Sequence, residues 1–323
     1  MSRFLVTGAS GFIGHHLVPA LRQRGFSVTQ AVRRHAGSEE SSGGIFAVGD
    51  MGPDTDWGAA LNQVDVVVHL AARVHVLKDS ASDPSREFRV ANVLGTERLA
   101  RSAAAKGVRR LIYLSSIGVN GNQSGLKVFT EQDEPRPYDA YAVSKWEAEE
   151  ALRAVAVETG LEIVILRPPL VYGPGNPGNF LRLLELVSSG WPLPLRAFNN
   201  RRSLIFVSNL VDAIIHCALH PAAAGQTYLV KDGEDVSTPG LIRRLAVLMG
   251  RSPRLISFPP SLLRWAAKIM GKSADIDRLM GSLVVDDSKI RAMLGWQPPY
   301  SLAYGLRETV TWYIREQPGA VTA

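Results

Sequence analysis

Three glycines spaced three residues apart, Gly8, Gly11 and Gly14, follow the apolar run 4–6. The apolar residues after them recur with helical spacing through Val18, so the pattern predicts a strand, a tight turn and a helix. Gly8 permits the turn, Gly11 lets backbone N–H groups approach an anion, and Gly14 lets the helix pack closely on the strand. This arrangement is typical of a site for the pyrophosphate of a dinucleotide. An ordinary strand-to-helix turn is the alternative interpretation.

Strand-like and helix-like segments alternate along the first half of the chain. This alternation predicts an α/β fold of the Rossmann type, a doubly wound parallel sheet with crossover helices. After residue 170 the alternation gives way to loops rich in proline and glycine. We therefore expect a dinucleotide-binding domain over 1–170 and a smaller C-terminal substrate-binding lobe over 171–323, with a return to the first domain around 203–230. The expected strands are 4–6, 27–32, 64–70, 111–114 and 162–166, and the expected helices include 86–106 and 139–159.

Composition narrows the class of protein. The chain has 323 residues, of which 46% are hydrophobic, and can bury a large core. No apolar run has the length of a membrane span and the first residues read as a strand, so we expect a cytoplasmic protein. The single Cys217 excludes an intrachain disulfide and a cysteine metal cluster, and no metal site is expected. His15, His16 and His69 are interpreted as structural, the last as a donor to backbone.

The net charge of +6 suits an anionic cofactor or substrate. Basic residues are dispersed, which argues against nucleic acid as a partner. At the end of the second expected strand, where a carboxylate usually binds the adenosine ribose of NAD, the chain has Arg33 and Arg34. Two guanidinium groups favour a 2′-phosphate, so we expect NADPH, with NAD(H) possible. Solvated surface arginines are the alternative. Asp50 is expected to receive the adenine amino group.

Tyr141 and Lys145 are four residues apart and lie on one face of a predicted helix. A cation about 4 Å from a phenol, at an effective dielectric of about 20, contributes about 4 kcal/mol. We therefore expect Lys145 to lower the pKa of Tyr141, making it a catalytic acid or base. A hydroxyl must orient the reacting oxygen, and Ser115 or Ser116, after the strand 111–114, is placed for this role.

At these residues the chain resembles the extended short-chain dehydrogenase/reductases that act on nucleotide sugars. The resemblance covers nearly the whole length. It is carried by six segments, TGASGFIG at 7–14, HLAA at 69–72, NVLGT at 92–96, SS at 115–116, YAVSK at 141–145 and RPPLVYGPG at 167–175.

The resemblance implies roles for individual residues. Ser116 corresponds to the catalytic hydroxyl beside Tyr141 and Lys145. The implied substrate is a UDP-sugar, bound by Ser116, Asn179, Arg202 and Arg278, and a homodimer is expected. The implied cofactor site comprises Gly8, Ser10, Gly11, Phe12, Ile13, Gly14, Arg33, Arg34, Asp50, Met51, Leu70, Ala71, Ala72, Asn92, Ser115, Tyr141, Lys145 and Pro168.

Two departures from the family narrow the expected activity. Ile117 and Gly118 stand where the 4,6-dehydratases have an Asp-Glu pair, and Arg33 stands near the position where 4-epimerases have an acid. The sequence therefore predicts a 4-ketoreductase that uses dissociable NADPH. Its expected reaction converts a UDP-2-acetamido-2,6-dideoxy-hexos-4-ulose to UDP-N-acetylfucosamine or UDP-N-acetylquinovosamine for surface polysaccharides. The alternatives are a UDP-sugar 4-epimerase with bound NAD and a non-catalytic dinucleotide sensor.

Overall fold

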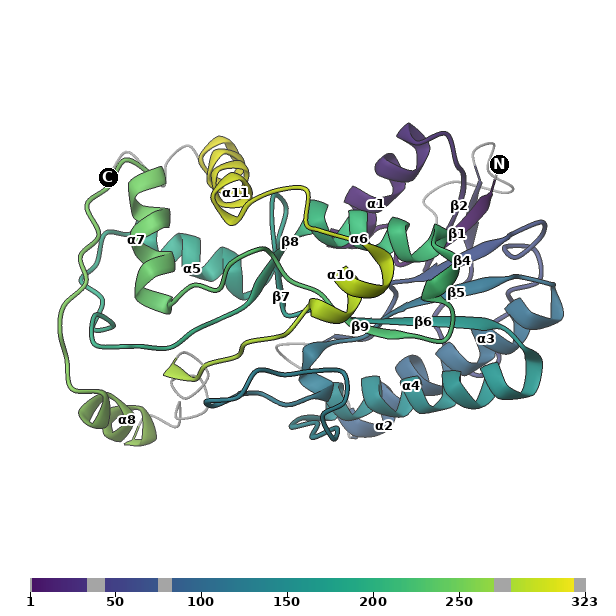
Figure 1. The fold of residues 1–323 in the computed structure, drawn as a ribbon, viewed down its shortest axis with the longest axis horizontal. Coiled ribbons are helices and arrows are strands. Elements are labelled where there is room, and N and C mark those ends of the chain that lie inside the picture. The colour runs from purple at the N-terminus through teal and green to yellow at the C-terminus, as the bar shows by residue number, and fades with distance from the viewer. Residues whose placement is uncertain (1, 34–43, 75–82, 270–279, 317–323) are drawn as a thin grey trace.

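The computed structural model describes residues 2–33, 44–74, 83–269 and 280–316. Its centre is a seven-stranded parallel sheet with the order β3-β2-β1-β4-β5-β6-β9 (Figure 1). This is the predicted Rossmann-type sheet, and all five predicted strands are present. The strands are β1 (Arg3–Thr7), β2 (Ser27–Val32), β3 (Ile45–Ala47), β4 (Val66–His69), β5 (Arg110–Leu114), β6 (Glu162–Arg167) and β9 (Thr227–Leu229).

Helices cover both faces of this sheet (Figure 1). Successive side chains of a strand point to opposite faces. Accordingly, Phe4 and Val6 join a core with α1 and α6, whereas Leu5 between them joins a second core with α3 and α4. The near-continuous apolar character of the strands follows from this two-sided burial. The helices are α1 (Phe12–Gln23), α3 (Gly95–Ala105), α4 (Ala140–Thr159) and α6 (Val207–Leu219).

The predicted helix 86–106 is helical throughout but not uniform. It consists of α2 (Pro84–Phe88), the π-helical turn η1 (Arg89–Leu94) and α3. A π-turn locally widens a helix and is often found at a functional site. Here it contains Asn92, one of the expected cofactor residues.

A third core lies in the other lobe, on the left in Figure 1. It packs α5 (Asn179–Ser188), α7 (Thr238–Leu248) and α11 (Leu302–Glu316) around the two-stranded parallel sheet of β7 (Leu170–Tyr172) and β8 (Leu204–Phe206). Ile13 and Val171 pack against both this core and the α1–α6 core. The boundary at residue 170 therefore stays a prediction. The remaining elements are η2 (Ile117–Val119), η3 (Pro221–Ala223), α8 (Pro260–Ile269) and α10 (Ser288–Leu294).

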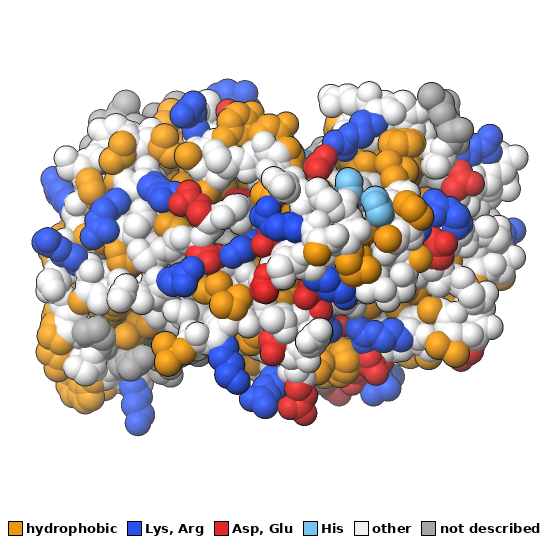
Figure 2. All heavy atoms as spheres, in the orientation of Figure 1, with side chains coloured by type: hydrophobic (Ala, Val, Ile, Leu, Met, Phe, Trp, Pro, Cys, Tyr) orange, Lys and Arg blue, Asp and Glu red, His pale blue; other side chains and the backbone are white. Residues whose placement is uncertain are grey.

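The surface in Figure 2 carries Lys and Arg side chains interspersed with Asp and Glu, without a continuous basic stripe on the face shown. Within the described ranges, no helix has both the length and the apolar character needed to cross a bilayer. The carboxyl ends of the parallel strands meet at one edge of the sheet, and β1 and β4 flank the point where the strand order reverses. Ligands of open α/β sheets bind at such a point.

Candidate active site

The glycine turn forms a close-fitting cradle between β1 and α1. Gly8 has φ +66°, and a Cβ on it would lie 2.8 Å from the backbone nitrogen of Ala71. A Cβ on Gly14 would overlap the carbonyl of Gly8 and the backbone of Ala9. Helix α1 has no side-chain cap and no acid in its first turn, and Ser10 and Gly11 are exposed. An uncapped helix N-terminus behind a turn that contains Gly8 and Gly11 fits the pyrophosphate of a dinucleotide.

The segment after β4 is held against this cradle by a buried chain of hydrogen bonds. The backbone N–H of Ala71 donates to Thr7 Oγ1 at 3.2 Å, which lies 2.6 Å from His69 Nδ1. His69 Nε2 lies 2.9 Å from Thr96 Oγ1. Burial, and secondarily the charge of Lys145, lowers the pKa of His69 to about 3, so its ring stays neutral. The expectation of a backbone partner was wrong: a fully buried imidazole here reaches two threonine hydroxyls instead.

Asn92 connects the same segment to α4. Its Oδ1 accepts from the Arg73 N–H at 2.7 Å, and its Nδ2 donates to the Arg73 carbonyl and to Ser144 Oγ, both at 3.0 Å. Ser144 directly precedes Lys145. Asn92, in the π-turn, thus contacts both the segment after β4 and helix α4, which are expected to flank the nicotinamide. Leu70 and Ala72 are partly buried beside Ala71, as are Phe12 and Ile13 at the start of α1.

At the expected adenosine end, Arg33 follows β2 and is largely exposed. Its Nε lies 3.0 Å from Asp50 Oδ1, an ion pair that the sequence analysis did not foresee. Met51 packs against the core between the sheet and α3. Arg34 lies outside the described residues.

Tyr141 and Lys145 lie on the first turns of α4, which begins after Asp139. The Asp139 carboxylate accepts from the Ala142 N–H at 2.8 Å, an N-cap that fixes the start of the helix. Lys145 Nζ donates to the Leu114 carbonyl at 2.8 Å. It also lies 4.6 Å from the centroid of the Tyr113 ring and 5.9 Å from that of Tyr141.

The serine turn follows β5 directly. Ser116 is partly buried, and its Oγ accepts from the Gly118 N–H at 3.1 Å. Ser116, Tyr141 and Lys145 therefore lie where β5 and α4 meet at the carboxyl edge of the sheet. Pro168 is buried beside this turn, and its carbonyl accepts from the Ile117 N–H at 3.0 Å. Ile117 and Gly118 are both buried and carry no acid.

Protonation in the ligand-free site differs from the sequence-based expectation. Burial raises the pKa of Tyr141, and the charges of Asp139 and Tyr138 raise it further. Burial lowers the pKa of Lys145 to about 7, opposed by the charge of Glu149. The predicted lowering of the Tyr141 pKa by Lys145 was therefore wrong for this state. Loss of solvent around the phenol is the largest cause of the shift, and the Lys145 ammonium is directed at the Leu114 carbonyl.

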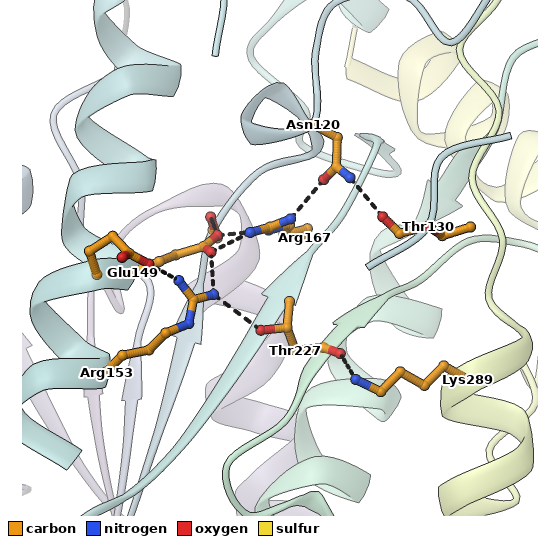
Figure 3. A network of polar contacts seen from close by, with 9 residues as sticks. Asn120, Thr130, Glu149, Arg153, Arg167, Thr227 and Lys289 are labelled. Atoms are coloured by element: carbon orange, nitrogen blue, oxygen red, sulfur yellow. Dashed lines mark hydrogen bonds and ion pairs between the residues drawn. The ribbon is translucent and has the colours of Figure 1, made fainter. Parts of the chain in front are cut away.

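A charged cluster centred on Glu149 lies behind the serine turn and was missed in the sequence analysis. Glu149 is fully buried and receives the guanidinium groups of Arg167 and Arg153 (Figure 3). Ser115 is buried and its Oγ donates to Glu149 Oε1 at 2.5 Å, whereas Ser116 is only partly buried. The available signal was spacing: Glu149 is one helical turn from Lys145, on the same face of α4.

Two of the expected substrate residues, Asn179 and Arg202, lie in the other lobe. Asn179 is exposed at the first turn of α5. Arg202 pairs with Val236 through its backbone, its Nη1 donates to the Gly281 carbonyl at 3.2 Å, and burial lowers its pKa. The charge of Tyr138 opposes this shift, which places Arg202 near the segment that leads into Tyr141. Arg278 lies outside the described residues.

The chain is similar over most of its length to one protein family and to several known proteins. Residues 4–230 match the model of the NAD dependent epimerase/dehydratase family. The chain is 41% identical to UDP-glucose 4-epimerase of Vibrio cholerae, covering 96% of this chain and 95% of that one. It is 32% identical to UDP-glucose 4-epimerase of Mycolicibacterium smegmatis, covering 96% and 98%. The solved structure of MoeE5 in complex with UDP-glucose and NAD superposes with a TM-score of 0.77 at 29% identity, covering 98% and 99%. The glycine cradle, the Ser116, Tyr141 and Lys145 site and this similarity together show that the chain belongs to the NAD dependent epimerase/dehydratase family.

Proposed function

We propose that the protein is a UDP-hexose 4-epimerase that keeps NAD bound throughout its catalytic cycle. The observation that carries this proposal is the full-length similarity, at 41% identity, to a UDP-glucose 4-epimerase. Ser116, Tyr141 and Lys145 serve hydride transfer in an epimerase or a reductase, so the geometry alone supports both. Ile117 and Gly118 argue against dehydration, because neither can move the protons that loss of water requires.

In this proposal the glycine cradle binds the pyrophosphate, and Leu70 to Ala72 with Asn92 line the nicotinamide ribose. NAD, when bound there, would supply an acceptor and a donor for the hydride at C4 of the sugar. Tyr141 takes the proton from the C4 hydroxyl as the carbonyl forms and gives it back as the carbonyl is reduced. Ser116 donates to the same oxygen. Lys145 stabilises the negative charge on Tyr141 and binds the ribose hydroxyls.

The 4-ketoreductase remains the second candidate, because Arg33, and not an acid, directly follows β2. Two observations weigh against it. Arg33 is paired with Asp50, whose carboxylate would repel a 2′-phosphate. The most similar relatives named above are epimerases. The intact catalytic residues also argue against a non-catalytic sensor.

The proposal is tested by incubating the purified protein with UDP-glucose or UDP-N-acetylglucosamine, with and without added NAD, and following the sugar by NMR. We expect the C4 epimer to form without net production of NADH. Tyr141→Phe removes the proton carrier and should abolish the product, whereas Tyr304→Phe, on the exposed side of α11, is the control. Absence of the epimer, together with stoichiometric oxidation of NADPH by a 4-ketosugar nucleotide, would instead support the reductase.

A further inference from the structure

The serine turn is attached to α4 at both of its ends by one buried acid and its arginine partner. Before Ser116, Ser115 donates to Glu149 Oε1 at 2.5 Å. After it, Asn120 accepts at 3.0 Å from Arg167 Nη1. Arg167 itself donates to Glu149 through Nε at 2.9 Å and Nη2 at 2.5 Å. The two-point contact between guanidinium and carboxylate fixes both groups in one plane.

Figure 3 shows the contacts of Arg167 with Glu149 and Asn120. Glu149 comes from α4, Arg167 from the end of β6 and Asn120 from the turn after η2. Asn120 also donates to the Thr130 carbonyl at 2.8 Å, which holds the turn from its far side. Glu149, Arg167 and Asn120 are each at least 97% buried. Their geometry is therefore set by packing rather than by solvent.

The same acid lies one helical turn after Lys145. Lys145 is fully enclosed, and burial lowers its pKa to about 7 while the charge of Glu149 opposes that shift. The other groups that face Lys145 are neutral or cationic in the resting protein. They are His69 on β4, Tyr113 on β5, Tyr141 on α4 and, on the far side of Glu149, Arg167 on β6 and Arg153 on α4.

We propose that Glu149 is a positioning residue that holds Ser116 in register with Tyr141 and provides a buried negative charge one turn from Lys145. This inference rests on the proposed function, since it assigns a role within the same active site. In this proposal the Glu149 side chain has two separate effects. The hydrogen bond to Ser115 positions the serine turn, and the charge favours the ammonium form of Lys145.

A purely structural ion pair would affect folding alone, so the test uses pH. Glu149→Gln keeps the shape but removes the charge, and Glu149→Asp keeps the charge. Glu150→Gln is the matched control, since Glu150 is the next residue of α4, also pairs with Arg153, and is exposed. For each folded variant, kcat for UDP-glucose and the dissociation constant of NADH are measured from pH 6 to 9.

For Glu149→Gln we expect kcat to fall tenfold or more with KM nearly unchanged. Loss of a negative charge lowers the pKa of Lys145 further, so NADH affinity and activity should decline at a pH lower by on the order of one unit. Glu149→Asp should keep the wild-type pH dependence, and Glu150→Gln should match wild type throughout. A folded Glu149→Gln protein with wild-type kcat and pH dependence would overturn the inference.

Removal of Glu149 leaves Arg167 buried without its carboxylate, which destabilises the folded protein. Ser115→Ala then tests the positioning role, because it removes one hydroxyl and leaves the ion pair intact. We expect a roughly tenfold loss of kcat with an unchanged pH profile. Wild-type kcat in Ser115→Ala would contradict the positioning role. The NADH measurement needs no sugar, so the inference about charge can be tested even if UDP-glucose is not a substrate.

Discussion

Arg33 and Asp50 form an ion pair beyond the end of β2, with Nε 3.0 Å from Oδ1 and both side chains about three-quarters exposed. This is the region that meets the adenosine ribose in a Rossmann-type site. β2 is not followed by an acid, and through this pair the Asp50 carboxylate lies beside Arg33 instead. It also engages the guanidinium that the sequence analysis assigned to a 2′-phosphate.

From this pair we predict that the wild-type protein binds NADH at least as tightly as NADPH. Asp50→Asn removes the acid and releases Arg33, so the preference should move toward NADPH by about tenfold. Fluorescence titration of both cofactors measures the ratio, and Asp54→Asn, in the exposed loop that follows, is the control. A wild-type protein that binds NADPH tenfold more tightly than NADH would restore the interpretation based on Arg33 and Arg34.

The glycine cradle predicts a specific cost for Gly8→Ala. Gly8 and Gly107 both have positive φ, but only Gly8 has a neighbour, the Ala71 nitrogen, at 2.8 Å from an added Cβ. Gly107→Ala should therefore lower the free energy of unfolding by about 1–2 kcal/mol through backbone strain alone. Gly8→Ala should lower it further and weaken NADH binding. Urea unfolding and NADH titration measure both effects, and equal stability of the two variants would contradict the close approach to Ala71.

The burial of Lys145 predicts that cofactor binding depends on pH. Below pH 7 the side chain carries its ammonium charge and can donate to ribose hydroxyls, and above about pH 7 the neutral amine is favoured. NADH affinity should therefore fall as pH rises from 7 to 9. Lys145→Met should bind more weakly and lose this dependence, whereas Lys106→Met, at the exposed end of α3, should keep it. The prediction fails if wild-type affinity is constant over this range.

The position of Arg202 predicts that the smaller C-terminal lobe contributes to substrate binding. A partly buried guanidinium near the Tyr141 segment is suited to a diphosphate, and each charge-assisted bond contributes about 1.5–3 kcal/mol. Arg202→Met should raise KM for a UDP-sugar by about tenfold to a hundredfold. The neighbouring Arg201→Met, at an exposed residue paired with Asp235, should have little effect. Equal KM values for the two variants would remove Arg202 from the substrate site.

Local patterns were sufficient to predict the sheet, the glycine turn and the shared helix face of Tyr141 and Lys145. Features that depend on tertiary contacts were not accessible. Ser115, Glu149 and Arg167 meet only because β5, β6 and α4 pack together. The protonation of Tyr141 depends on how completely it is buried, which no spacing reveals.

The choice between reductase and epimerase was equally inaccessible from the catalytic residues. Both reactions use the same hydroxyl, phenol and ammonium, and they differ in whether the dinucleotide leaves after each hydride transfer. Arg33 and Arg34 favoured NADPH in the sequence, whereas in the fold Arg33 is paired with Asp50. Asp50, 17 positions after Arg33, thus weakens the argument that Arg33 binds a 2′-phosphate.

The most direct test of the central claim follows the hydride itself. UDP-glucose carrying deuterium at C4 is incubated with the protein, and the C4 epimer is isolated and analysed by mass spectrometry and NMR. An epimerase that borrows the hydride and returns it within one binding event predicts a product that keeps the deuterium at C4. Loss of deuterium from the product, or its appearance in free dinucleotide without any epimer, would contradict the proposal.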